Sequence, residues 1–147
     1  MKTFDFEFTV PASQKRVKDF HHDTSVLRIL TPPPTIMQVH SMEPLAEGSV
    51  SRFTIWAGPI PLKCEATHRR VSDAGFTDVQ TAGPMKSWAH THRFIELGPS
   101  ETKVTEHIEY EHAGGLWGLV TRAFFSPPAL TALFTYRKFQ TRRHCRA

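Results

Sequence analysis

Hydrophobic and polar residues alternate at the start of the chain and through most of its middle. Apolar side chains recur at every second position of the first segment, at Phe4, Phe6, Phe8 and Val10. This period is typical of a strand with one buried face. Six further segments carry strand-like patterns, at residues 36–42, 49–57, 62–71, 76–81, 87–97 and 103–112. The turns between them are too short for crossover helices, so we expect an antiparallel sheet of about seven strands.

Helical patterns occur after the first strand and near the end of the chain. Val17 and Phe20 share a face of a first short helix. Asp23 and Thr24 can cap a second short helix. Further on, an apolar stripe with helical spacing predicts a long C-terminal helix: Leu116, Leu119, Val120, Ala123, Phe124, Leu130, Leu133 and Phe134. Ser126 and two prolines interrupt the stripe, and because Ser and Pro suit a helix start, we expect a kink or a break with a restart.

The order of these elements predicts an α+β fold in which the whole chain, residues 1–147, forms one domain. A strongly twisted antiparallel sheet has one face to bury, and the last helix is the one long apolar helix that can cover it. If the sheet curls around this helix, an internal cavity lies between the two. Concave, mostly apolar spaces of this kind are typical binding sites for small molecules.

Composition and termini narrow the class of protein. The 147 residues are 39% hydrophobic and 22% charged, close to the average of globular domains. No apolar run approaches the ~20 residues of a membrane span, and the first residues lack the apolar block of a secretory signal. Cys64 and Cys145 do not form a metal-binding or redox motif. We therefore expect a cytoplasmic monomer or homodimer without stable membrane insertion.

A formal net charge of +4 raises the question of a nucleic-acid partner. Much of the excess lies at the C-terminal end, in Arg137, Lys138, Arg142, Arg143 and Arg146. Such cations either form a binding patch or complement the negative end of a helix dipole. No aromatic RNA-binding signature or recognition-helix motif accompanies them, so we expect no nucleic acid among the partners. An interaction module that uses this basic end stays open as a further class.

Two histidines of the next-to-last strand share a face with aromatic side chains. His90 and His92 alternate with outward-facing residues, and a hairpin after this strand brings His92 opposite Glu106. Buried ionisable groups must be paired, and a histidine facing a carboxylate is the basic unit of general acid–base catalysis. We therefore predict that His92 or His90 moves protons and that Glu106 orients or charges the imidazole. A pair that only braces the sheet stays open as the alternative.

Residues expected to contact a bound molecule lie on the inner faces of the strands and on the last helix. They are Asp78, Gln80, Trp88, Tyr110, His68, His40, Cys64, Phe94, Ile108, Leu119 and Phe124. Of these, Gln80 or Tyr110 is expected to hold a carbonyl oxygen of the substrate.

The run His90-x-His92-x3-Glu96 resembles the first metal motif of cupins. The glycines that flank the cupin motif are missing, and no second motif supplies another histidine. The histidines are therefore interpreted as hydrogen-bond partners, and we expect neither a metal nor a cofactor. The sequence also lacks a phosphate-binding loop, a dinucleotide glycine fingerprint and a nucleophile elbow.

Three stretches of the sequence carry a resemblance to a known family. Residues 75–80, 83–85 and 88–94 contain the pattern F-x-D-x-Q-x-x-G-P-x-x-x-W-x-H-x-H-x-F. The pattern resembles the ligand-binding, cyclase/dehydrase-like branch of the SRPBCC superfamily, the group of START, Bet v 1 and polyketide-cyclase proteins. Further similar residues from the first strand to Arg137 extend the resemblance over nearly the whole chain. Relatives often carry Trp where this chain has Cys64.

The resemblance implies a helix-grip fold with an apolar cavity for a lipid, polyketide, terpenoid or aromatic ligand. One such scaffold serves carriers, sensors and metal-free cyclases, so the fold alone does not fix an activity. With the polar residues on the inner face, we expect a small hydrophobic molecule to be bound and to undergo cofactor-free cyclisation, dehydration or isomerisation in secondary metabolism. The alternative is a non-catalytic hydrophobic ligand- or lipid-binding or transport protein.

Overall fold

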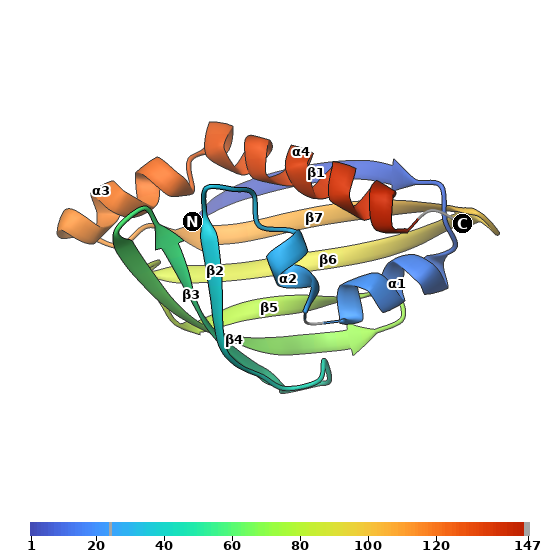
Figure 1. Cartoon of the computed structure of the whole chain (residues 1–147), viewed down its shortest axis with the longest axis horizontal. Coiled ribbons are helices and arrows are strands. Elements are labelled where there is room, and N and C mark those ends of the chain that lie inside the picture. Colours follow the sequence, from blue (N-terminus) through green and yellow to red (C-terminus); the bar gives the residue numbers. More distant parts are fainter. Residues whose placement is uncertain (24, 146–147) are drawn as a thin grey trace.

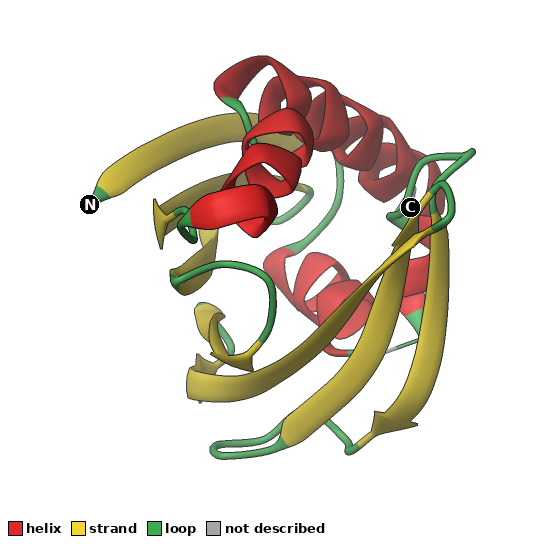
Figure 2. Cartoon of the chain, turned by 90° about the vertical axis from the view of Figure 1, so that its left-hand side faces the viewer, coloured by secondary structure: helices red, strands yellow, loops and turns green. Residues whose placement is uncertain are grey.

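The computed structural model of the chain describes residues 1–23 and 25–145. A strongly curved sheet runs through the molecule, and its concave side faces the helices (Figures 1 and 2). In chain order the elements are β1 (Lys2–Val10), α1 (Gln14–His22), α2 (Val26–Ile29), β2 (Ile36–Met42), β3 (Val50–Ala57), β4 (Ile60–Ser72), β5 (Gly75–Ala82), β6 (Ser87–Gly98), β7 (Glu101–Glu111), α3 (Gly115–Phe124) and α4 (Pro127–His144). The expected cap residue Thr24 and Arg146 of the basic end lie outside the described residues. None of the described helices combines the length and the hydropathy needed to cross a membrane.

The seven strands of the described sheet pair in the order β1-β7-β6-β5-β4-β3-β2, and every pair is antiparallel. From β2 to β7 each strand lies beside the next one along the chain, because the turns between them are short. β1 instead pairs over its full length with β7, from Lys2 opposite Tyr110 to Val10 opposite Thr102. The α+β helix-grip arrangement expected from the sequence, with two short helices after β1 and a long C-terminal helix, is confirmed.

Apolar side chains fill the concave side over β1, β6 and β7. Leu130 and Phe134 of α4 are buried there, and the Phe134 ring lies 5.7 Å from the ring of Phe4. Val17 of α1 packs in a second apolar cluster with Phe94 of β6. Each large side chain that is fully buried stabilises the fold by about 1.5–3 kcal/mol. The inner face of β2 to β5 lies beside this core, and there the protein leaves space for a site.

The expected interruption of the C-terminal helix is confirmed. α3 ends at Phe124 and α4 begins at Pro127. The Ser126 hydroxyl accepts a hydrogen bond from the Ala129 N–H, and prolines occupy the first two helical positions. This is the local chemistry of a helix start. On the N-terminal side of the break, α3 extends to the end of the molecule opposite the C-terminus (Figure 1).

The face that α3 turns toward the sheet differs from the expected one. Leu119 and Phe124, expected to contact a bound molecule, are 65% and 43% exposed and do not line the cavity described below. Gly118 and Thr121 are buried instead. A side chain at position 118 would collide with the carbonyl oxygen of Ala113, so only a glycine permits this close approach. Backbone contact, and not the apolar stripe, therefore sets the orientation of α3.

Candidate functional site

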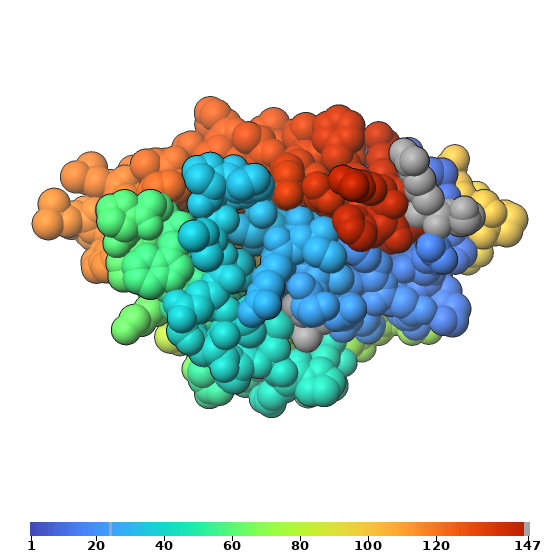
Figure 3. All heavy atoms as spheres, viewed as in Figure 1, coloured from blue at the N-terminus to red at the C-terminus, as the bar shows by residue number. Residues whose placement is uncertain are grey.

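A cavity of about 160 Å³ lies between the inner face of β2 to β6, helix α2 and helix α4. Its wall is mostly apolar and is formed by Leu27, Met37, Ser51, Phe53, Ile55, Cys64, Glu65, Ala66, His68, Asp78, Gln80, Pro84, Met85, Trp88, His90, Phe125, Leu133, Phe134 and Arg137. In the space-filling view, α2 and β2 (blue to cyan) and α4 (red) close over this side of the molecule (Figure 3). An engineered cavity of about 150 Å³ admits benzene, so the space suits a molecule built on one ring.

Five ionisable side chains meet on the inner face of four neighbouring strands. They are His68 of β4, Asp78 of β5, His90 and His92 of β6, and Glu106 of β7. The register places them together, because His68 is opposite Asp78, Asp78 is opposite His90, and His92 is opposite Glu106. The expected juxtaposition of His92 and Glu106 is therefore present.

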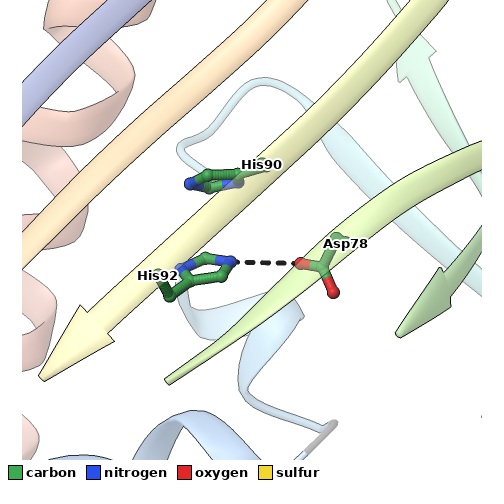
Figure 4. Close-up of side chains that lie close together, drawn as sticks. All are labelled: Asp78, His90 and His92. Carbon is green, nitrogen blue, oxygen red and sulfur yellow. Dashed lines mark hydrogen bonds and ion pairs between the residues drawn. The ribbon is translucent and has the colours of Figure 1, made fainter. Parts of the chain in front are cut away.

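The five groups form a continuous chain of polar contacts. Asp78 lies between two histidines, with His68 Nδ1 2.5 Å from its Oδ1. On the other side, His92 Nε2 lies 3.1 Å from Asp78 Oδ2 (Figure 4). Glu106 Oε2 lies 2.7 Å from His90 Nε2 and 2.8 Å from His92 Nδ1. The second of these contacts is an ion pair whose alignment is not that of a hydrogen bond. Within this chain of polar contacts, the order of the side chains is therefore His68, Asp78, His92, Glu106, His90.

At its His68 end, the chain of polar contacts continues to a hydroxyl group, that of Ser51. His68 Nε2 lies 3.1 Å from Ser51 Oγ, and both residues line the cavity. A hydroxyl, an imidazole and a carboxylate in this order can pass a proton along the line of hydrogen bonds. Ser51 was not expected from the sequence as a site residue, because strand alternation alone does not show which serine faces a histidine.

The carboxylates of the cluster are ionised. Burial opposes the charged form of Glu106, but the charges of His92 and His90 and the hydrogen bond with His90 hold its pKa well below the usual 4.5. Burial likewise works against ionisation of Asp78, but hydrogen bonds with His68 and His92 outweigh it and hold the pKa far below 3.8. Opposite charges and hydrogen bonds to the charged form are the general causes of such depressed pKa values.

Two histidines only two positions apart carry opposite pKa shifts. Burial lowers the pKa of His90, and the charge of His92 lowers it further, to about 4. Burial also disfavours the charged form of His92, but Glu106 and the hydrogen bond with Asp78 raise its pKa to about 9. At neutral pH, His92 is therefore an imidazolium between two carboxylates and His90 is a neutral imidazole.

The network assigns the tautomer of His90. An ionised Glu106 only accepts hydrogen bonds, so neutral His90 donates to it through Nε2–H. The lone pair of His90 then lies on Nδ1, and His90 belongs to the cavity wall. His92 and Glu106 do not line the cavity and lie behind His90. Of the three residues predicted as catalytic, His90 is thus the one in position to touch a bound molecule.

Aromatic rings hold the cluster in place. The ring centroid of Phe76 lies 4.4 Å from that of His92, and the rings of His90 and His92 are 3.9 Å apart. His21 of α1 packs over the same region, 6.1 Å from His92, with its Nδ1 2.9 Å from the Val17 carbonyl oxygen. Burial lowers the pKa of His21 to about 4. These packed rings exclude water from the side of the cluster that faces away from the cavity.

The structure divides the residues predicted to contact a ligand into two groups. Those that line the cavity are Asp78, Gln80, Trp88, His68 and Cys64. Those that do not are Tyr110, Phe94, Ile108, His40, Leu119 and Phe124. The inner face of β7 lies under Leu130 and Phe134 of α4, so Ile108 and Tyr110 belong to the apolar core, as does Phe94 beneath α1.

Two further expectations are corrected in detail. His40 is exposed and lies 2.7 Å from the Thr54 hydroxyl, because a bulge between Val39 and Ser41 interrupts the alternation of β2. Gln80, expected to hold a substrate carbonyl, uses both ends of its amide on the backbone of Met85, at 2.8 and 3.4 Å. Tyr110 is buried in the core, whereas Gln80 lines the cavity with its amide bound to the backbone.

The metal motif considered from the sequence does not assemble. Glu96 is exposed, and a register shift follows it in β6. Asp78, His90 and His92 do offer ligand atoms within 4.8 Å of one another (Figure 4). In this arrangement both ring nitrogens of His92 face carboxylate oxygens, at 2.8 and 3.1 Å. Asp78 thus contacts His92, and both histidines contact Glu106.

A curved antiparallel sheet gripping a long C-terminal helix, with an apolar cavity between them, defines the START-like helix-grip class of folds. A START superfamily protein from Mycobacterium smegmatis has a TM-score of 0.71 and 11% identity, over 97% of this chain and 96% of its own. Zhui aromatase/cyclase from Streptomyces sp. R1128 has a TM-score of 0.68 and 16% identity, over 98% of this chain and 90% of its own. The likeness expected from the sequence motifs is confirmed at the level of the fold.

A third solved structure with this fold is an enzyme with its ligands bound. Norcoclaurine synthase from Thalictrum flavum, in complex with dopamine and hydroxybenzaldehyde, has a TM-score of 0.63 and 15% identity, over 92% of this chain and 83% of its own. No protein-family model matches the sequence, and no curated protein does. Function must therefore be argued from the site itself.

Proposed function

We propose that the protein binds a small, ring-containing molecule in the cavity and catalyses a cofactor-free proton transfer on it, which leads to isomerisation, dehydration or cyclisation. The observation that carries the proposal is the neutral His90 on the cavity wall, backed by Glu106 and the imidazolium of His92. Pairs of groups whose surroundings push their pKa values apart are the usual arrangement of acid–base catalysis. An aromatase/cyclase and a norcoclaurine synthase that holds dopamine and hydroxybenzaldehyde share this fold, and this supports a ring-containing ligand.

In the proposed reaction, His90 Nδ1 takes a proton from a ligand carbon next to a carbonyl group. The electron pair of the broken C–H bond moves onto the carbonyl oxygen, and His90 becomes an imidazolium beside Glu106. The same proton is then returned to another carbon in an isomerisation, or to a leaving hydroxyl group, which departs as water, in a dehydration. Ser51, hydrogen-bonded to His68, is a second polar group in the cavity wall and can donate to the carbonyl oxygen.

A non-catalytic carrier of a hydrophobic molecule is the second candidate. It is favoured by the fact that the buried carboxylates and histidines largely satisfy one another, as they do in purely structural networks. In a carrier the cavity size and the apolar lining matter, and His90 contributes only to ligand affinity. The predicted cytoplasmic location and the choice between a monomer and a homodimer remain predictions from the sequence.

Proton transfer is testable without knowing the natural substrate. 2-Indanone is a ring-sized ketone with exchangeable C–H bonds, and its hydrogen–deuterium exchange in D₂O is followed by NMR. We expect the protein to accelerate exchange and His90→Ala to slow the catalysed rate by about 10²–10⁴-fold, the usual contribution of a positioned base.

The matched control is His107→Ala. His107 is also paired with a carboxylate, Asp5 at 2.6 Å, but lies on the outer face of β7. This variant should leave exchange unchanged. The protein is a non-catalytic carrier if 2-indanone binds but its exchange is not accelerated. The same conclusion follows if His90→Ala does not change the exchange rate.

A further inference from the structure

A single arginine of α4 lies in the wall of the otherwise mostly apolar cavity. Arg137 follows Leu130 and Phe134 on the buried stripe of the helix, and Thr141 continues the stripe one turn later. Its guanidinium carbon lies 5.3 Å from the centroid of the Phe134 ring. The His90 ring meets the same phenyl ring edge-on at 5.3 Å. The arginine and the proposed base are therefore neighbours of one aromatic side chain and face one cavity.

The guanidinium has few partners inside the protein. Its Nε–H donates to the Leu30 carbonyl oxygen at 3.2 Å. Within residues 1–23 and 25–145, no carboxylate lies within 4.0 Å of it, because Asp78 and Glu106 contact histidines instead. A guanidinium carries five N–H donors, so four remain on the two terminal nitrogens. None of these four makes a hydrogen bond within the described residues.

An arginine in this position is costly unless an anion joins it. Burial lowers the pKa of Arg137, yet an arginine side chain stays protonated in proteins. The protein therefore holds a half-buried cation in a mostly apolar wall. The charges of Glu106 and Asp78 favour it from a distance, but no described carboxylate forms an ion pair with it, and a partly buried charge without a contacting partner is disfavoured. A leucine or methionine at this position would cover the cavity without that cost. The unused donors indicate a ligand that brings its own negative charge.

We propose that the molecule bound in this cavity is a carboxylate and that Arg137 binds the two carboxylate oxygens with two parallel hydrogen bonds. The ring of the bound molecule would then lie against Phe134 and His90. This inference rests on the proposed function and names its substrate class: small cyclic or aromatic acids. The planar guanidinium matches a carboxylate in both geometry and charge. Anchoring the acid group at Arg137 would also fix which ring carbon faces His90.

The test compares two probes with the same ring and side chain, cinnamate and its methyl ester, of which only cinnamate is charged. Both are titrated into the full chain at pH 7 by calorimetry. We expect cinnamate to bind about ten- to a hundredfold more tightly than the ester, the range for hydrogen bonds to a charged group. Arg137→Gln should abolish this preference while the affinity for the ester stays within a few-fold of wild type. Arg137→Lys keeps the charge without the planar pair of donors and should retain part of the preference.

The matched control is Arg142→Gln. Arg142 lies on the same helix and also donates through Nε to a backbone carbonyl, that of Thr9 at 2.8 Å, but it does not line the cavity. It should bind both probes as wild type does. If wild type binds the ester as tightly as cinnamate, or if Arg137→Gln weakens both probes equally, Arg137 is structural and the inference is wrong. Binding of neither probe, together with no exchange of 2-indanone, would instead overturn the proposed function.

Discussion

His90 and His92 illustrate how position within one strand decides the chemistry of identical side chains. Both are buried on the inner face of β6 and both contact Glu106. His92 has a second carboxylate, Asp78, on its other ring nitrogen, whereas His90 has the cavity on one side. The extra negative charge keeps one ring protonated and leaves the other neutral. A positioned base and the cation behind it are thus made from the same residue type.

The raised pKa of His92 makes the stability of the fold depend on pH. The pKa is about 9 in the folded protein, against 6.5 ordinarily, so the folded state binds the proton more tightly than the unfolded state. The stabilisation is fully present below pH 6.5 and is lost as the pH rises toward 9. At about 1.4 kcal/mol per unit, the free energy of unfolding should fall by on the order of 3 kcal/mol across this window.

Urea unfolding at several pH values between 6 and 9.5 measures this decline. His92→Gln cannot titrate and should show a much flatter profile, although it is less stable throughout because Glu106 and Asp78 lose a cation. His107→Gln serves as the control, since His107 is largely exposed and its removal should leave most of the decline in place. A wild-type profile that is flat over the window would show that His92 is not protonated between the carboxylates.

Sequence reasoning at the scale of single residues succeeded where strand pairing alone decides the contact. Alternation in β6 and the register of the next hairpin were enough to place His92 opposite Glu106. The bond of Gln80 to the Met85 backbone was not predictable, because it depends on the path of a turn. Arg137 was counted with the basic C-terminal end, although its spacing from Leu130 and Phe134 already placed it on the buried stripe.

At the scale of elements, local chemistry was predictable and the orientation of helices was not. Ser126 and the prolines after it specify a helix start by their own hydrogen bonding and backbone angles, so the break could be predicted from three residues. The face of α3 depends on the close approach of Gly118 to Ala113. That contact involves the path of the backbone between β7 and α3, which hydrophobic periodicity does not describe.

This contact predicts an unusual response to an alanine substitution. In an exposed helix, Gly→Ala is stabilising by about 1 kcal/mol because alanine has the higher helix propensity. At Gly118 the added methyl group would collide with the Ala113 carbonyl oxygen, so Gly118→Ala should lower the melting temperature instead. Gly98→Ala is the control, because Gly98 lies outside the helix, at the end of β6, and no atom lies within 4 Å of the methyl group that the substitution adds. Thermal unfolding followed by circular dichroism compares the two; equal melting temperatures would mean that α3 does not depend on this contact.

At the scale of the whole molecule, the size of the cavity restricts the ligand. The sequence predicted a cavity between the sheet and the last helix, but its volume depends on how far α2 and α4 settle onto the strands. At about 160 Å³ the space suits a single ring with a short substituent better than a long polyketide chain or a lipid tail. The cavity therefore favours small cyclic ligands for the proposed function.

Filling the cavity should separate binding from folding. Cys64 lines the cavity, and Cys64→Trp would place a large ring in it. We expect this variant to lose at least tenfold in affinity for both cinnamate and its methyl ester, while overpacking destabilises the fold by about 1–3 kcal/mol. Lys63→Trp, at the exposed neighbouring position of β4, should bind both probes as wild type does. Unchanged binding by Cys64→Trp would place the binding site elsewhere.

The buried chain of polar contacts that joins His68, Asp78, His92, Glu106 and His90 also has a consequence for how the polypeptide folds. Its contacts join four adjacent strands, β4 to β7, and each contact exists in one register only. A slip of one residue between two of these strands would turn one partner to the opposite face and leave a buried carboxylate or imidazolium without its counter-charge. Misaligned sheets are thereby penalised far more than they would be with an all-apolar inner face. The residues proposed to move protons also select the correct pairing of the strands, so removing them would loosen the specificity of folding as well as the chemistry.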